Sequence, residues 1–79
     1  MKITVYSSES CIFCRQLKEW FLSEGIEFEN RDVSKEKEFY DEFIAHGGSG
    51  IPLTIFEKPN GEINKVSGMN KSKILEVLK

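Results

Sequence analysis

The sequence predicts an α/β fold in which a four-stranded mixed sheet is flanked by three helices. Three observations predict it: a chain of only 79 residues, β-branched and aromatic runs that alternate with helical patterns, and a Pro-Asn-Gly turn between the last two predicted strands. The predicted order of elements is βαβαββα. A chain this short has apolar material for one core, so we expect residues 1–79 to form a single domain.

The N-terminal third of the chain predicts a strand and a helix. Residues 2–7 include a β-branched and aromatic run with little alternation, which is typical of a strand buried on both faces, so we expect this strand to be central. Residues 13–21 carry one apolar stripe at helical spacing, and Gly25 follows where a C-cap glycine belongs. The stripe consists of Phe13, Leu17, Trp20 and Phe21.

The middle of the chain predicts a short strand and a second helix. Alternating apolar residues between 26 and 33 indicate the strand, and Asp32 or Ser34 is expected to cap the helix that follows. Two glycines at 47–48 end this helix. Its expected apolar face consists of Phe39, Tyr40, Phe43 and Ile44.

The C-terminal third predicts two strands and a helix. Residues 53–56 read as a third strand, and the turn at 59–61 connects it to a fourth strand at 62–66, whose weak pattern is typical of a sheet edge. A last helix begins near Asn70 and carries the apolar residues Ile74, Leu75 and Leu78. A βαβ crossover favours parallel strands and a hairpin antiparallel ones, so the sheet is expected to be mixed.

Composition and charge exclude several classes of function. Eleven Lys and Arg against thirteen Asp and Glu leave a net charge of -2, which provides no basic field for a nucleic acid or an anionic membrane. The apolar stretches are far shorter than the roughly 20 residues of a membrane-spanning helix, and no signal-peptide pattern begins the chain. We therefore expect a cytoplasmic monomer that binds neither nucleic acid nor membrane.

The only two cysteines, Cys11 and Cys14, lie at the predicted junction between the first strand and the first helix. Closing a four-residue loop with a disulfide stabilises a fold by only about 2 kcal/mol, so stability is a poor reason for this spacing. A zinc site needs four ligands, and the one other strong candidate is His46, which is better explained as a solvated residue at a helix end. A metal site shared between two chains stays open, but the spacing favours redox chemistry.

The position of Cys11 at a helix N-terminus is expected to stabilise its thiolate, because unpaired N–H groups and the helix dipole favour negative charge there. In the predicted mechanism this thiolate attacks a substrate disulfide, and the more covered Cys14 then attacks Cys11 to release the reduced product. Two nearby charges act in opposite directions, since Glu9 opposes the thiolate and Arg15 can reach it from the next turn.

These residues resemble the glutaredoxin family. The resemblance is carried by Val-Tyr-Ser at 5–7, Cys-Ile-Phe-Cys at 11–14, Ile-Pro at 51–52 and Gly68 before the last helix, and it covers nearly the whole chain. It implies a thioredoxin-like fold, a redox-active disulfide, and a role in electron transport and cell redox homeostasis without a tightly bound cofactor. It also implies a cis peptide bond before Pro52, with the backbone of Ile51 presented to the substrate.

The resemblance further implies which residues surround the substrate and the reductant: Phe13, Ile51, Pro52, Gly68, Met69 and Asn70. Glutathione-using glutaredoxins have a lysine three residues before the first cysteine and aspartates before the last helix. This chain has Ser8 and Asn70 at those places, which weakens a glutathione site without abolishing it.

The same departures bring the chain closer to small glutaredoxin-like redoxins that thioredoxin reductase reduces and that supply electrons to ribonucleotide reductase. Glutathione and thioredoxin reductase are therefore both candidate electron donors, and the expected substrates are disulfide-containing proteins or glutathione mixed disulfides. The alternatives of a different class are a dimer that holds an iron-sulfur cluster or zinc through Cys11 of each chain, and a domain used only for protein contacts.

Overall fold

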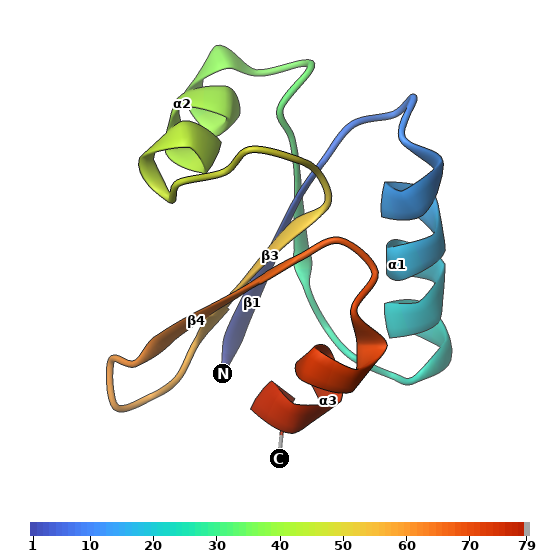
Figure 1. Ribbon diagram of the computed structural model, residues 1–79, viewed down its shortest axis with the longest axis vertical. Coiled ribbons are helices and arrows are strands. Elements are labelled where there is room, and N and C mark those ends of the chain that lie inside the picture. The colour runs from blue at the N-terminus through green and yellow to red at the C-terminus, as the bar shows by residue number, and fades with distance from the viewer. Residues whose placement is uncertain (79) are drawn as a thin grey trace.

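The computed structural model describes residues 1–78, and its elements follow the order βαβαββα. The strands are β1 (Lys2–Ser7), β2 (Glu29–Asp32), β3 (Leu53–Glu57) and β4 (Ile63–Ser67). The helices are α1 (Ile12–Ser23), α2 (Lys37–Ala45) and α3 (Lys71–Leu78). Helices α1 and α3 lie on one face of the sheet, and α2 lies on the other (Figure 1). The predicted fold class is confirmed.

The strands are ordered β2-β1-β3-β4 across the sheet. Strand β1 pairs parallel with β2 and antiparallel with β3, and β3 pairs antiparallel with β4. The two interior strands, β1 and β3, are almost continuously buried because helices cover both faces of the sheet. The predicted central position of residues 2–7 and edge position of the fourth strand are both confirmed.

Alternation along the strands divides the core into two clusters. In β1, Ile3 and Val5 face α1 and α3, whereas Tyr6 faces α2. The larger cluster consists of Ile3, Val5, Leu17, Phe21, Phe56, Val66 and Ile74. The smaller cluster consists of Tyr6, Phe43, Leu53 and Ile55. The larger cluster holds α1 against the sheet and thereby positions the first turn of α1, which carries Cys14.

The strand predicted between 26 and 33 begins further along the sequence than expected. Strand β2 begins only at Glu29, because Ile26 and Phe28 pack as partly buried side chains against the larger cluster. Its four residues are polar and pair with β1 through the main chain. An edge strand needs no second apolar face, so polar residues are tolerated there.

The predicted cap of α2 by Asp32 or Ser34 is wrong. The helix begins at Lys37, and its N-cap residue, Glu36, makes no side-chain cap hydrogen bond. Asp32 instead accepts the backbone N–H of Ser34 on its Oδ1 at 2.8 Å, which forms a local turn directly after β2. The Asp32 side chain therefore stabilises this local turn and does not cap α2.

Several apolar side chains of the predicted helical stripes lie at the surface. Helix α2 has nine residues, and the only one of them that is buried is Phe43, which belongs to the smaller cluster. Phe13 on α1 is 59% exposed. The other exposed members of the predicted faces are Tyr40, Ile44 and Leu75. Within residues 1–78, no helix has the length and apolar character to cross a membrane.

Candidate active site

The two cysteines lie where the chain leaves β1 and enters α1. Cys11 is the N-cap of α1, with extended backbone angles of φ −89° and ψ 111°. Its Sγ accepts a hydrogen bond from the backbone N–H of Cys14 at 3.1 Å. The sulfur thus occupies the place that a serine or aspartate oxygen usually takes in a capped helix. A hydrogen bond of this kind is stronger when its acceptor is charged, so the cap supports a nucleophilic sulfur.

The two sulfurs differ in their access to solvent. Cys11 is half-buried, whereas Cys14 is 0% exposed, and both are free thiols. Burial first, and then the hydrogen bond to Cys11, raise the pKa of Cys14 to about 12, against the opposing effects of the Ser8 backbone and the Lys18 charge. Cys14 is therefore a protonated thiol at neutral pH, and Cys11 is the sulfur that an incoming disulfide can reach.

A second segment reaches the cysteines from the loop before β3. The Sγ atom of Cys11 lies 4.0 Å from the carbonyl oxygen of Ile51. The Ile51–Pro52 peptide bond is cis, which is the geometry that the family resemblance implied. Pro52 is buried, and Ile51 is half-buried against the smaller cluster. The main chain of Ile51 is consequently the polar surface next to the exposed sulfur.

A third segment, between β4 and α3, is tied to the second. The backbone N–H of Gly68 donates to the carbonyl oxygen of Pro52 at 2.8 Å. Gly68 has a φ of 74°, a left-handed conformation that favours glycine. The next residues have structural partners: Met69 packs against the larger cluster, and Asn70 accepts the N–H of Lys73 on its Oδ1 at 3.1 Å, which caps α3.

The structure therefore brings most of the predicted site residues together, but not all of them. Cys11 contacts both Cys14 and Ile51, and Gly68 is hydrogen-bonded to Pro52, the residue after Ile51. Phe13 and Asn70 are exposed, whereas Met69 is partly buried and packs against the larger cluster.

Comparison with known protein families matches residues 3–58 of the chain to Glutaredoxin. The chain belongs to the glutaredoxin family. The glutaredoxin-like protein NrdH of Lactococcus lactis subsp. lactis is 29% identical over 51 residues, which make up 65% of this chain and 71% of the relative. The SPbeta prophage-derived thioredoxin-like protein YosR of Bacillus subtilis is 29% identical over an alignment of 80 positions, covering 100% of this chain and 96% of the relative.

Solved structures agree with this assignment. The glutaredoxin-like protein NrdH-redoxin from Escherichia coli superposes with a TM-score of 0.81 at 25% identity, over 98% of this chain and 95% of the other. The family and the fold together support thiol-disulfide oxidoreductase activity in general terms.

The sequence predicts that Glu9 and Arg15 act on Cys11 of this glutaredoxin through their charges, and this stays a prediction. Among the described residues, no hydrogen bond joins the side chain of Glu9 or Arg15 to the Cys11 sulfur: Glu9 forms an exposed ion pair with Lys35, and Arg15 is exposed. Lys18 is the cation that lowers the pKa of Cys14, against the larger opposing effect of burial. Lys18 was missed from the sequence, although its spacing of four residues from Cys14 on a helix was the available signal.

His46 has a structural place in this glutaredoxin. It is the C-cap of α2, and its ring lies against that of Tyr6, with centroids 5.9 Å apart. Within residues 1–78, no group of three or more His, Cys, Asp or Glu side chains is arranged to hold a metal ion.

Proposed function

We propose that this glutaredoxin reduces disulfides of protein substrates through a dithiol cycle of Cys11 and Cys14. The proposal rests on the difference in access between the two sulfurs, since Cys11 is half-buried and Cys14 is 0% exposed behind it. One sulfur can meet a substrate, and the other can only meet the first. A two-step thiol-disulfide exchange requires this asymmetry.

In the first step, the thiolate of Cys11 attacks one sulfur of the substrate disulfide. The substrate S–S bond breaks, a bond forms between Cys11 and the attacked sulfur, and the other sulfur leaves as a thiolate that takes up a proton. The main chain of Ile51, whose carbonyl oxygen lies 4.0 Å from the Cys11 sulfur, is positioned to pair with an extended substrate segment.

In the second step, Cys14 gives its proton to solvent and attacks the Cys11 sulfur. The mixed disulfide breaks, the second substrate sulfur leaves and is protonated, and the Cys11–Cys14 bond forms, so two electrons have passed to the substrate. In the mixed disulfide the Cys11 sulfur is neutral and no longer raises the pKa of Cys14 through its charge. The Ser8 backbone and Lys18, which lower that pKa, then act against burial and the hydrogen bond to Cys11, without the added effect of a Cys11 charge.

For the electron donor we propose thioredoxin reductase in preference to glutathione. The residue three positions before Cys11 is the neutral Ser8, and the neutral side chain of Asn70 is occupied in capping α3. Both charges that the resemblance associates with glutathione are thus missing. The Escherichia coli NrdH-redoxin is described by a thioredoxin-like activity profile, which supports the same choice. We propose ribonucleotide reductase as the candidate electron acceptor. We also propose a cytoplasmic location, because the cycle needs a reducing compartment.

A coupled assay tests the proposal. The reduction of insulin disulfides is followed through NADPH oxidation, with either thioredoxin reductase or glutathione plus glutathione reductase as the donor system, and with Cys11→Ser as the inactive control. We expect turnover with thioredoxin reductase to exceed turnover with glutathione. A faster reaction with glutathione contradicts the proposed donor, and no turnover with either system contradicts the dithiol cycle.

A further inference from the structure

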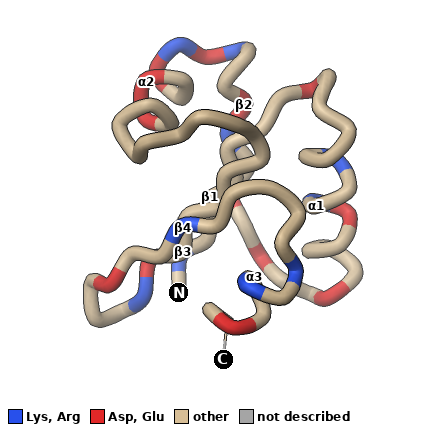
Figure 2. The backbone as a smooth tube through the Cα atoms, viewed as in Figure 1, with Lys and Arg blue, Asp and Glu red and all other residues tan. Residues whose placement is uncertain are grey.

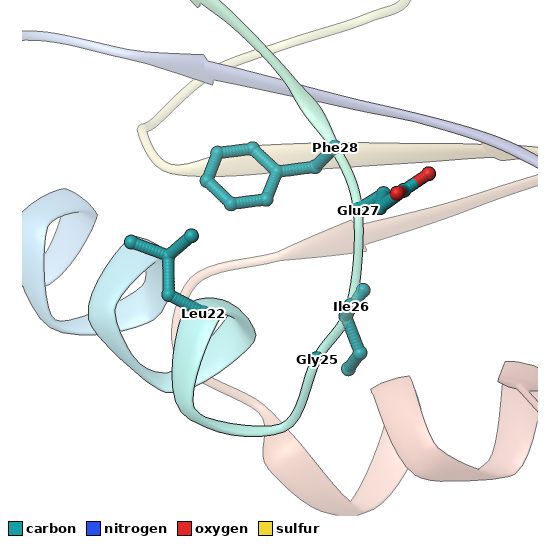
Figure 3. A pocket seen from close by; sticks show the side chains of 5 residues that line it. All are labelled: Leu22, Gly25, Ile26, Glu27 and Phe28. Carbon is teal, nitrogen blue, oxygen red and sulfur yellow. The ribbon is translucent and has the colours of Figure 1, made fainter.

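A pocket lies at the end of α1 that is farthest from the cysteines. Its volume is about 650 Å³, and Leu22, Gly25, Ile26, Glu27 and Phe28 line it. Leu22 and Phe28 extend to the same side of the connecting segment, and the carboxylate of Glu27 extends to the other side (Figure 3). The side chain of Leu22 is 71% exposed. Residues 1–78 therefore leave an apolar wall of this pocket open to solvent.

The walls of the pocket are held rigidly by the end of α1. Gly25, with a φ of 69°, donates its N–H to the Leu22 carbonyl oxygen at 3.2 Å, and Ile26 donates to the Phe21 carbonyl oxygen at 2.8 Å. This pair of hydrogen bonds is the Schellman ending of a helix. The Phe28 ring packs against the Phe21 ring, with centroids 5.5 Å apart. Because the pocket is already formed, little conformational entropy would be lost in ordering it when a ligand binds.

The surroundings of the pocket are acidic. Residues 19–30 contain four Glu and no Lys or Arg, whereas the rest of the chain contains nine acidic and eleven basic residues. The last turn of α1 has no basic residue either, so the negative end of the helix dipole adds to the field. Figure 2 shows acidic residues along the later turns of α1 and the segment that leads to β2. The four are Glu19, Glu24, Glu27 and Glu29.

Few of these acidic charges are neutralised by the fold. Glu29 is paired with Arg31. Among residues 1–78, Glu19, Glu24 and Glu27 have no cation within salt-bridge distance. A basic residue does lie near this end of α1, since the Lys71 ammonium is 5.3 Å from the centre of the Trp20 ring. The combination of an open apolar wall and unpaired carboxylates is complementary to a basic and apolar ligand.

We propose that this pocket docks a protein partner through a segment in which one large apolar side chain is flanked by Lys or Arg residues. The apolar side chain packs between Leu22 and Phe28, and the basic residues face the surrounding carboxylates. Helix α1 has 12 residues and is therefore about 18 Å long, so the docked segment lies roughly that far from Cys11. The docking site is thus separate from the redox site and goes beyond the proposed function.

Titration of the isotopically labelled full chain with a blocked peptide, Gly-Lys-Lys-Phe-Lys-Lys-Gly, tests the proposal by amide chemical shifts. We expect saturable shifts concentrated at residues 22–28. Binding should weaken about fivefold or more in about 0.5 M salt, in Leu22→Ser, and in the double variant Glu24→Gln/Glu27→Gln. The matched controls are Leu75→Ser and Glu38→Gln, which change an exposed apolar residue on α3 and an exposed acidic residue on α2.

Four outcomes overturn the proposal. They are the absence of shifts at 22–28, equal weakening by the control variants, equal binding of a peptide with Ser in place of Phe, and concentration-dependent shifts of the same residues without peptide, which would assign the pocket to a second copy of the chain. Leu22→Ser should keep its activity in the coupled redox assay, so failure of the docking proposal and failure of the redox proposal are distinguishable.

Discussion

The backbone N–H of Cys14 donates to the sulfur of Cys11 at 3.1 Å, so a hydrogen bond connects the two reactive residues in the absence of substrate. The same contact caps α1, and the packing of α1 on the larger cluster fixes where it lies. Because folding places Cys11 and Cys14 in the same helical turn, part of the entropy of bringing their sulfurs together is lost before the reaction begins.

Burial of Cys14 makes the free energy of unfolding decrease as the pH becomes alkaline. Its pKa is raised to about 12 in the folded protein, against about 8.5 in an unfolded chain. The contribution to stability is fully present below about pH 8.5 and is lost as pH rises toward the folded value, by up to about 1.4 kcal/mol per pH unit. Urea unfolding of the reduced protein at about pH 8 and about pH 10 measures it.

We expect a larger loss of stability between these two pH values in the wild-type protein than in Cys14→Ala. Tyr6, whose pKa is raised first by its burial and then by Glu42, contributes alike to both proteins and cancels in the comparison. Equal pH dependence of the two proteins would show that Cys14 is not held as a buried thiol.

Lys18 should assist the second chemical step without affecting the first. Its charge lowers the pKa of Cys14, so Lys18→Gln leaves less Cys14 thiolate in the mixed disulfide and slows ring closure several-fold. Rapid-mixing measurements separate formation of the mixed disulfide from its decay. Lys37→Gln is the control, because Lys37 lies on α2 and pairs with Asp41. Slowing of the first step alone would refute this role.

Glutathione use should increase when the two missing charges are restored. The double variant Ser8→Lys/Asn70→Asp provides a cation for a glutathione carboxylate and a carboxylate for its amine, and aspartate caps α3 as well as asparagine does. We expect a gain of about tenfold or less in the glutathione-coupled rate, which corresponds to about 1.4 kcal/mol. The thioredoxin reductase-coupled rate is the internal reference. No gain would mean that these positions do not face glutathione.

Tyr6 connects β1 to α2 through its hydroxyl, which donates to Glu42 Oε1 at 3.0 Å. Arg31 binds the same carboxylate. Tyr6→Phe keeps the buried ring and removes the donor, so we expect a loss of about 1 kcal/mol in the free energy of unfolding and no loss of redox activity. Urea unfolding measures the loss, and Tyr40→Phe, which alters an exposed tyrosine on α2, is the control.

The effect of Tyr6→Phe should shrink in acid. Burial raises the pKa of Glu42, but hydrogen bonds from Arg31 and Tyr6 outweigh burial and shift it downward overall. A carboxylate with a lowered pKa contributes stability above its ordinary value and loses that contribution as pH falls through the folded value. A Tyr6→Phe effect that is the same at neutral and acidic pH would argue against the carboxylate as the partner.

Much of the fold and the centre of the site could be predicted from local sequence. Residues 2–7 and the stripe around Leu17 and Phe21 have strong periodicities, and the spacing of Cys11 and Cys14 carries its chemistry with it. The start of α2 could not be predicted, because Asp32 had two local uses and the turn with Ser34 took precedence over the cap.

Contacts between segments that are distant in the sequence could not be predicted either. The hydrogen bond from Gly68 to Pro52 and the one from Tyr6 to Glu42 depend on how the sheet brings separate loops and elements together. The exposure of Phe13 could not be read from the sequence for a related reason, since a helical stripe shows which residues share a face but not how far the opposing surface extends.

The most direct test of the account is to trap the mixed disulfide. Cys14→Ser, which retains Cys11 but cannot close the ring, is mixed with insulin and examined by mass spectrometry without reductant, with Cys11→Ser as the matched control. We predict a stable covalent adduct through Cys11 in the first variant and none in the second. An adduct formed through Cys14 in Cys11→Ser, or none in Cys14→Ser, would contradict the assignment of Cys11 as the attacking sulfur and Cys14 as the resolving one.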